Sequence, residues 1–167
     1  MNGFLYKLKM GFKCFYLNSI ASSPIWSTRM RRLLLRLYGH KVSDMKSKCF
    51  IGEGSGHIIM GNGSFCNVKC LFDCANDIII GNNCRIAYGV TFVNSTHVVG
   101  TPKQRAGGGK NASIIVEDGV WIGANSTIMP GVTIAKGCII AAGAIVNKST
   151  EVNGLYGGVP AIRIKDL

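Results

Sequence analysis

The sequence contains few charged residues and no long apolar run. Charged residues make up 16% of its 167 positions and hydrophobic residues 47%, a balance that excludes an intrinsically disordered chain. No stretch reaches about 18 consecutive apolar residues, so we expect no membrane-spanning helix. Glycine, in contrast, occurs 22 times, close to twice its usual share of about 7%. Because glycine costs about 1 kcal/mol at an interior helix position, the composition favours a single turn-rich, all-β domain over a helix bundle.

Acidic residues are scarce, and this scarcity is greatest in residues 1–48. The chain holds 19 Lys and Arg against 8 Asp and Glu, and residues 1–48 account for +9 of the net +11. Such a segment is either a solvated helical face or a patch that contacts an anionic membrane or a polyanionic glycan. No nucleic-acid-binding module accompanies it, so we expect no nucleic acid partner. The basic residues are Lys7, Lys9, Lys13, Arg29, Arg31, Arg32, Arg36, Lys41, Lys46 and Lys48, with Asp44 as the one acid.

The first twenty residues do not form a secretory signal, because Lys7, Lys9 and Lys13 interrupt their apolar run. We expect an amphipathic, partly helical basic segment of a cytoplasmic protein, either free or peripheral at the inner face of the membrane. The seven cysteines are an odd number, which is typical of reduced thiols. Cys66, Cys70 and Cys74 recur every four residues, but no CxxC pair or nearby histidine supports a metal site, so we interpret them as small buried thiols.

A six-residue repeat predicts the fold. One aliphatic residue recurs at every sixth position between Val116 and Val146, and the same rule holds from Ile80 through Phe92. An earlier stretch from Met60 is looser and lies two residues out of phase. A period of six fits neither an α-helix nor a simple strand, but it fits a chain that bends after each short strand and closes a triangular turn every eighteen residues. Glycine and asparagine would supply the corners, and the prediction is a parallel β-helix.

The repeat lapses between Phe92 and Val116, where residues 98–113 are rich in glycine and lysine. Long loops in compact domains are usually functional, so we predict an extruded loop here, with His97 at its mouth. The predicted organisation is a basic segment over residues 1–48 and a β-helix domain over residues 49–167, whose C-terminal tail begins at 152. His40 and His57 are interpreted as ordinary core or surface residues.

Four stretches carry a resemblance to a known family. They are Ile80–Ile86, Gly89–His97, Gly119–Gly123 and Gly158–Lys165. In this order and spacing, the chain over about residues 29–167 resembles the hexapeptide-repeat acyltransferases, and most closely their sugar and polysaccharide O-acetyltransferases. The resemblance implies a left-handed β-helix, a homotrimer with active sites between chains, and acetyl-CoA as co-substrate without a metal.

The resemblance also implies a catalytic apparatus. His97 matches the catalytic histidine of the family, and acetyl transfer to a sugar hydroxyl needs such a base with a pKa near 7. A backbone N–H beside Gly123 or Ala124 would hold the oxyanion of the tetrahedral intermediate. The indole N–H of Trp121 is a second candidate, although Trp121 could equally be packed at an interface. Transfer is expected to be direct, without an acyl-enzyme.

Binding residues follow from the same resemblance. Gly123, Ala124 and Ala142 match the segment where relatives hold the pantetheine arm of coenzyme A by the main chain. Arg163 and Lys165 match the segment that supplies cations to the phosphates, or else they belong to an ordinary charged tail. The candidate acceptor-binding residues are Asn67, Asp73 and Asn94.

The stretch Arg29–Gly39 resembles the lead-in of surface-polysaccharide acetyltransferases. Together with the basic segment, it predicts an acceptor that is lipid-linked, polymeric or anionic, such as a capsular or sialylated glycan. Two alternatives are an acetyltransferase of a small acceptor (a simple sugar, an antibiotic or an amino sugar) and a non-enzymatic β-helix, which scattered threonines disfavour. A zinc hydratase of this fold would need three histidine ligands, and the three histidines lie too far apart in the sequence.

Overall fold

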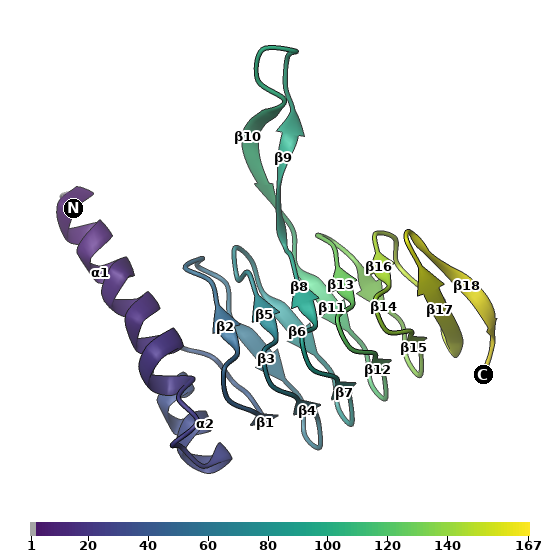
Figure 1. Cartoon of the computed structure of the whole chain (residues 1–167), viewed down its shortest axis with the longest axis horizontal. Coiled ribbons are helices and arrows are strands. Elements are labelled where there is room, and N and C mark those ends of the chain that lie inside the picture. The colour runs from purple at the N-terminus through teal and green to yellow at the C-terminus, as the bar shows by residue number, and fades with distance from the viewer. Residues whose placement is uncertain (1–2) are drawn as a thin grey trace.

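A computed structural model describes residues 3–167 as a helical lead-in, a β-helix and one projecting hairpin (Figure 1). Helix α1 (Gly3–Phe15) continues into a π-helical turn, η1 (Tyr16–Ala21), and α2 (Thr28–Arg36) follows. The Ser27 hydroxyl caps α2 by accepting a hydrogen bond from the Met30 N–H at 3.3 Å. Among these described residues, no helix is long and apolar enough to cross a membrane.

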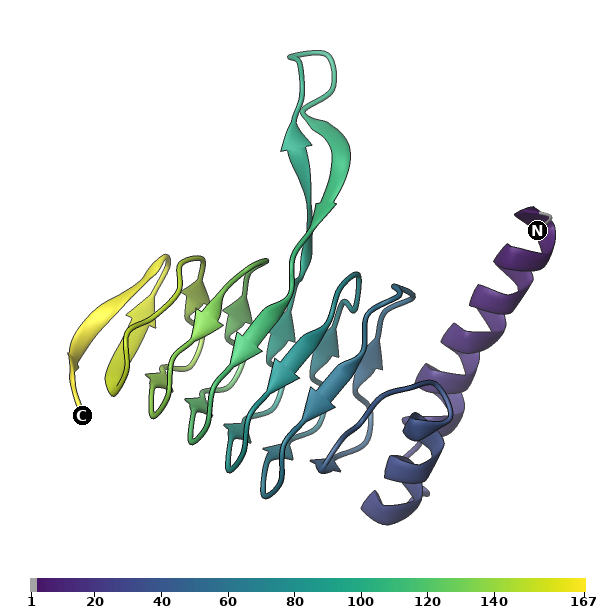
Figure 2. The same ribbon diagram turned by 180° about the vertical axis from the view of Figure 1, so that it is seen from behind.

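The β-helix has three faces of parallel strands, and Figure 2 shows it from behind. The first face holds β1 (Asp44–Met45), β4 (Phe65–Cys66), β7 (Arg85–Ile86), β12 (Trp121–Ile122), β15 (Ile139–Ile140) and β17 (Gly154–Gly158), and ends in the antiparallel β18 (Ala161–Asp166). The second face holds β2 (Phe50–Ile51), β5 (Leu71–Phe72), β8 (Thr91–Phe92), β13 (Thr127–Ile128) and β16 (Ile145–Val146). The third face holds β3 (Ile58–Met60), β6 (Ile78–Ile80), β11 (Ile114–Val116) and β14 (Thr133–Ile134). The predicted all-β, parallel β-helical fold with a helical N-terminal segment is confirmed.

The six-residue repeat forms the core. Each repeated aliphatic side chain points inward and stacks on its counterpart one turn away, as Val116 does between Ile80 and Ile134. All of these side chains are buried, and each contributes about 1.5–3 kcal/mol through burial. Corners need a left-handed backbone, which glycine and asparagine adopt most easily: φ is 71° at Gly119 and 57° at Asn125. The sequence pattern and the packing therefore agree.

The turns differ in length at one edge, between the second and third faces. Trp121 pairs with Ile139 eighteen positions later, whereas Phe65 pairs with Arg85 twenty positions later. The two additional residues lie in the corner at 73–77, which explains the break in phase before Ile80. The projecting hairpin leaves the same edge.

The hairpin consists of β9 (Ser95–Val99) and β10 (Ala106–Asn111), paired antiparallel (Figure 1). It confirms the extruded loop, although its strands begin at residue 95 rather than 98. The β-helix likewise begins earlier than residue 49, because β1 at Asp44 already pairs with β4. His40 is buried and accepts a hydrogen bond from the Ile58 N–H through Nδ1 at 3.1 Å, which gives it a place in the core.

Candidate active site

His97 lies on β9, opposite Gly109 of β10, and its side chain is exposed. Its Nδ1 is 2.9 Å from the carbonyl oxygen of Gly107. A carbonyl only accepts hydrogen bonds, so in the neutral ring Nδ1 carries the proton and Nε2 carries the lone pair. The hairpin therefore fixes the ring of His97 in the tautomer that a general base requires, with Nε2 free to accept a proton.

Asn94 anchors the base of the hairpin. Its side chain is 0% exposed. Its Oδ1 accepts a hydrogen bond from the Ala75 N–H at 3.0 Å, and its Nδ2 donates one to the carbonyl of Asn76. Both ends of the amide are thus occupied within the chain, which corrects the expectation that Asn94 contacts an acceptor: it connects β8 and the hairpin to the long corner at 73–77.

Asp73 and Asn76 hold the two hairpin strands from that corner. The Ser95 hydroxyl donates a hydrogen bond to Oδ2 of Asp73. Asn76 accepts one from the Ser113 hydroxyl at 2.9 Å and donates one to Oδ1 of Asn111 at 3.0 Å. No sequence motif predicted a role for Asn76 or Ser113. The one signal for this corner was the two-residue break in phase, which places it beneath the hairpin.

A second group of candidate residues lies on the first face and on its edge with the second face. Trp121 is on the first face, is 54% exposed, and lies between Arg85 and Ile139 of the adjacent turns. Gly123 and Ala124 follow it at the corner, and Ala142 occupies the same corner one turn later. A Cβ on Gly123 would lie 2.5 Å from the Ala142 nitrogen, so two successive turns approach here too closely for any side chain.

The backbone N–H groups at this corner differ in whether they have an acceptor. The Gly123 N–H donates to the carbonyl of Ile140 at 2.8 Å and is therefore occupied. The N–H groups of Ala124 and Ala142 have no acceptor within the described chain. Of the two oxyanion candidates at Gly123 and Ala124, the structure leaves only the Ala124 N–H available, with the Ala142 N–H as a neighbouring donor. Asn67 lies on the same edge nearer the N-terminal end, and its Oδ1 accepts from the Val68 N–H at 2.8 Å.

The two groups do not meet within one chain. His97 and Asp73 are at the edge between the second and third faces, whereas Asn67, Ala124 and Ala142 are at the edge between the first and second faces. The hairpin leaves the β-helix between β8 and β11, and Ala124 follows β12, so both groups lie at neighbouring levels along the axis (Figure 1). Two chains that pack side by side with parallel axes would bring the edges together.

The two cationic side chains of the C-terminal strand, Arg163 and Lys165, differ in their contacts. The guanidinium of Arg163 donates to Asp166 at 2.8 Å, to the Tyr156 hydroxyl at 3.1 Å and to the Val152 carbonyl at 3.0 Å. The hydrogen bond to Asp166, followed by that to Tyr156, raises the pKa of Arg163. Arg163 therefore helps to hold β17 to β18, and its role toward the coenzyme phosphates stays a prediction. Lys165 is exposed and has no such partner among residues 3–167.

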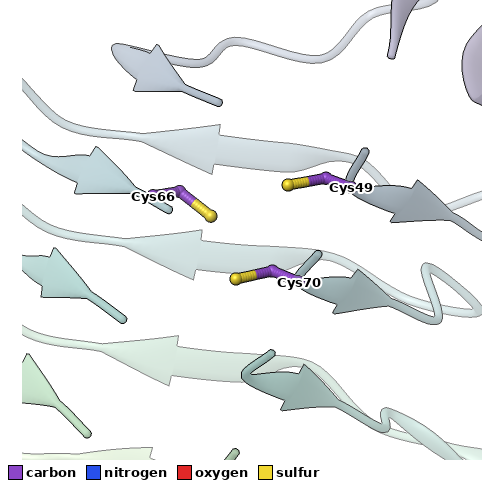
Figure 3. Close-up of side chains that lie close together, drawn as sticks. All are labelled: Cys49, Cys66 and Cys70. Carbon is purple, nitrogen blue, oxygen red and sulfur yellow. The ribbon is translucent and has the colours of Figure 1, made fainter. Parts of the chain in front are cut away.

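Three thiols converge inside the β-helix (Figure 3). The sulfur atoms of Cys49, Cys66 and Cys70 lie within 4.8 Å of one another, and all three residues are buried. Their sulfurs lie 3.3–3.6 Å from one carbonyl oxygen, that of Asn67. The hydrogen bond with Cys49 raises the pKa of Cys70. Cys74 lies outside the cluster, and Cys49 instead joins Cys66 and Cys70.

The six-residue repeat and the three-faced parallel β-helix define a hexapeptide-repeat fold. The family model described as bacterial transferase hexapeptide (six repeats) matches residues 113–148. Over these residues, and over the longer stretches shared with the relatives below, the chain is similar to hexapeptide-repeat acetyltransferases.

Among curated proteins, the galactoside O-acetyltransferase of Lactococcus lactis is 29% identical over 126 residues, 72% of this chain and 61% of that protein. The match thus spans less than two thirds of the relative's length. Among solved structures, a maltose O-acetyltransferase from Clostridium difficile is 25% identical with a TM-score of 0.80, covering 99% of this chain and 89% of that one. A hexapeptide-repeat acetyltransferase from Vibrio cholerae, complexed with acetyl coenzyme A, is 25% identical with a TM-score of 0.78, covering 98% and 87%. A polySia-specific acetyltransferase is 28% identical with a TM-score of 0.63, covering 76% and 59%.

Proposed function

We propose that this protein is an acetyl-CoA-dependent O-acetyltransferase that modifies a hydroxyl group of a sugar within a glycan. The observation that carries the proposal is the orientation of His97: its Nδ1–H is held by the Gly107 carbonyl, and its Nε2 is left as a base. Relatives named as galactoside and maltose O-acetyltransferases, and one bound to acetyl coenzyme A, support the reaction class.

In the proposed reaction, Nε2 of His97 takes the proton of the acceptor hydroxyl as its oxygen attacks the thioester carbonyl of acetyl-CoA. The oxyanion that forms is stabilised by a fixed donor, for which the unused N–H of Ala124 is the best placed candidate. The C–S bond then breaks, and the imidazolium of His97 returns its proton to the departing thiolate. The products are the O-acetyl ester and coenzyme A, and the enzyme carries no acyl group at any step.

The proposed active unit is a homotrimer. The separation of His97 from Ala124 and Ala142 onto different edges supports this, because each site would need the hairpin of one chain and the corner of its neighbour. Lys165 remains a candidate for the phosphates of coenzyme A. Trp121 is exposed on the face that such a neighbour would cover, which fits either contact with the coenzyme or packing between chains.

We propose a lipid-linked, polymeric or anionic glycan of the cell surface as the acceptor. The basic lead-in of residues 1–48 supports it, as do the exposed Lys103, Arg105 and Lys110 of the hairpin region. The likeness to a polySia-specific acetyltransferase agrees with this choice. Cytoplasmic synthesis fits seven cysteines that are free thiols. The second candidate function is acetylation of a small sugar, which the galactoside and maltose relatives favour.

The test is thiol release from acetyl-CoA with a panel of simple sugars, sialylated oligomers and lipid-linked repeats. We expect acceptor-dependent release that falls by about 10²- to 10⁴-fold in His97→Ala, the usual contribution of a general base. His57→Ala is the matched control, since His57 is a partly exposed histidine on the same edge, paired with Asp77 at 3.6 Å and outside the hairpin. Full activity in His97→Ala would contradict the proposal, and the productive acceptor would decide between the two candidate functions.

A further inference from the structure

Helix α1 exposes a stripe of large apolar side chains along its whole length. Leu5, Leu8, Phe12 and Phe15 are each 56–61% exposed. Their spacing of three, four and three residues places them on one side of an α-helix. Side chains of this size are normally turned into a core, and four in a row on a surface helix indicate a surface that contacts something apolar.

The stripe points away from the rest of the molecule. Contacts to the β-helix come from the other side of the helical lead-in: Lys13 donates through Nζ to the Gly54 carbonyl at 2.9 Å, and Leu17 is buried. Asn18 exchanges two hydrogen bonds with Ile51, at 2.9 and 2.7 Å. These contacts fix the rotation of the helix, so the stripe cannot turn inward. In both ribbon views α1 flanks the N-terminal end of the β-helix, opposite β17 and β18 (Figures 1 and 2).

The basic residues around the apolar stripe favour a negatively charged binding partner. Residues 1–43 contain no Asp or Glu. Lys7 and Lys9 are exposed on α1. Helix α2 exposes Leu33 together with Arg29 and Arg36, and the exposed Leu37 directly follows it. A second copy of α1 is a poor occupant of the stripe, because α1 carries three lysines and no acidic residue and two such helices would repel. A polyanionic glycan would neutralise the lysines but leave the leucine and phenylalanine side chains in water.

We infer that α1 docks the protein onto an anionic lipid bilayer, lying in the plane of the interface. The apolar stripe would enter the boundary between headgroups and acyl chains, and the lysines would contact lipid phosphates. With 13 residues, the helix is about 20 Å long, too short to span a bilayer but sufficient to lie on it. The inference does not depend on the proposed reaction. If the proposed trimer forms with parallel axes, three copies of α1 lie at the same end and bind together with higher avidity.

The test is flotation of the full-length protein with vesicles of phosphatidylcholine alone or with about one third phosphatidylglycerol. We expect binding to the anionic vesicles, weakening as salt is added. Leu8→Glu/Phe12→Glu should lower the vesicle-bound fraction by about tenfold or more, because it removes two anchors and adds repulsion. Val152→Glu/Ile162→Glu changes two equally exposed residues (55% and 67%) at the opposite end and should retain most of the binding.

Three results would overturn the inference. One is equal binding by the α1 variant and the wild type. Another is a loss of oligomeric size in the α1 variant, since the stripe would then be covered by another copy. The third is binding to a soluble polyanionic glycan without binding to vesicles. Circular dichroism and thiol release with a soluble acceptor show that the variant is folded. Because flotation needs neither acetyl-CoA nor an acceptor, its failure is distinct from a failure of the proposed reaction.

Discussion

Replacing Asn94 by alanine tests whether the hairpin positions His97. The side chain of Asn94 is fully buried beneath the hairpin and is occupied at both ends by backbone groups of the corner at 73–77. Alanine removes both hydrogen bonds and leaves the Ala75 N–H and the Asn76 carbonyl without partners. We therefore expect the hairpin base to loosen while the remaining turns of the β-helix keep their packing.

The size of the effect follows from those two groups. An unsatisfied buried polar group costs about 1–3 kcal/mol, so the loss is about 2–6 kcal/mol if both remain dry and less if water enters. Most of this lost stabilisation concerns the hairpin. Its other side-chain hydrogen bonds to the corner are the one between Ser95 and Asp73 and those made by Asn76. A displacement of His97 by about 1 Å is enough to reduce turnover about 100-fold.

Steady-state kinetics separate this role from direct contact with the acceptor. In Asn94→Ala, kcat should fall by about one to two orders of magnitude while KM for acetyl-CoA stays nearly constant, because Ala124 and Ala142 lie on another edge. Asn147→Ala is the matched control, since Asn147 is an exposed asparagine at the corner after β16. The reasoning is refuted if kcat is retained within about twofold, or if the loss appears only as a higher KM for the acceptor.

Two further predictions concern stability. Gly123→Ala places a Cβ 2.5 Å from the Ala142 nitrogen, so it should lower the midpoint of thermal unfolding by several degrees, about 1–3 kcal/mol of overpacking; an unchanged midpoint would show that the two turns can separate freely. His40 should make the protein acid-sensitive. Burial, followed by Lys13 and His57, lowers the pKa of His40 from 6.5 to about 4. As pH falls, His40 therefore binds a proton in the unfolded chain before it does so in the folded protein. The neutral, buried His40 contributes about 3 kcal/mol to the free energy of unfolding. This contribution is complete above pH 6.5 and is lost between pH 6.5 and 4. Urea unfolding at fixed protein concentration should show this slope in the wild type and a reduced slope in His40→Gln, and equal slopes would exclude His40 as its source.

The sequence by itself determined the β-helix. A strict six-residue period places one side chain inside at every strand, and this holds from Ile80 through Val146 because each strand is a local unit whose inward position depends only on counting. The sequence also predicted the extruded loop, because the period lapses between Phe92 and Val116. His97 was predicted as the catalytic base from its place at that lapse and from the resemblance to a family, and this stays a prediction.

The tertiary structure decided which partners each side chain meets. The sequence suggested that Asn94 contacts an acceptor, but stacking of the turns places Asn94 under the hairpin. Cys49, rather than Cys74, joins Cys66 and Cys70 because corners one turn apart superpose. These contacts join positions about twenty residues apart. Which residues stack on one another depends on the two additional residues in the corner at 73–77, between the second and third faces. A local period determines which side chains are inside, but only the stacked chain determines which neighbours they contact.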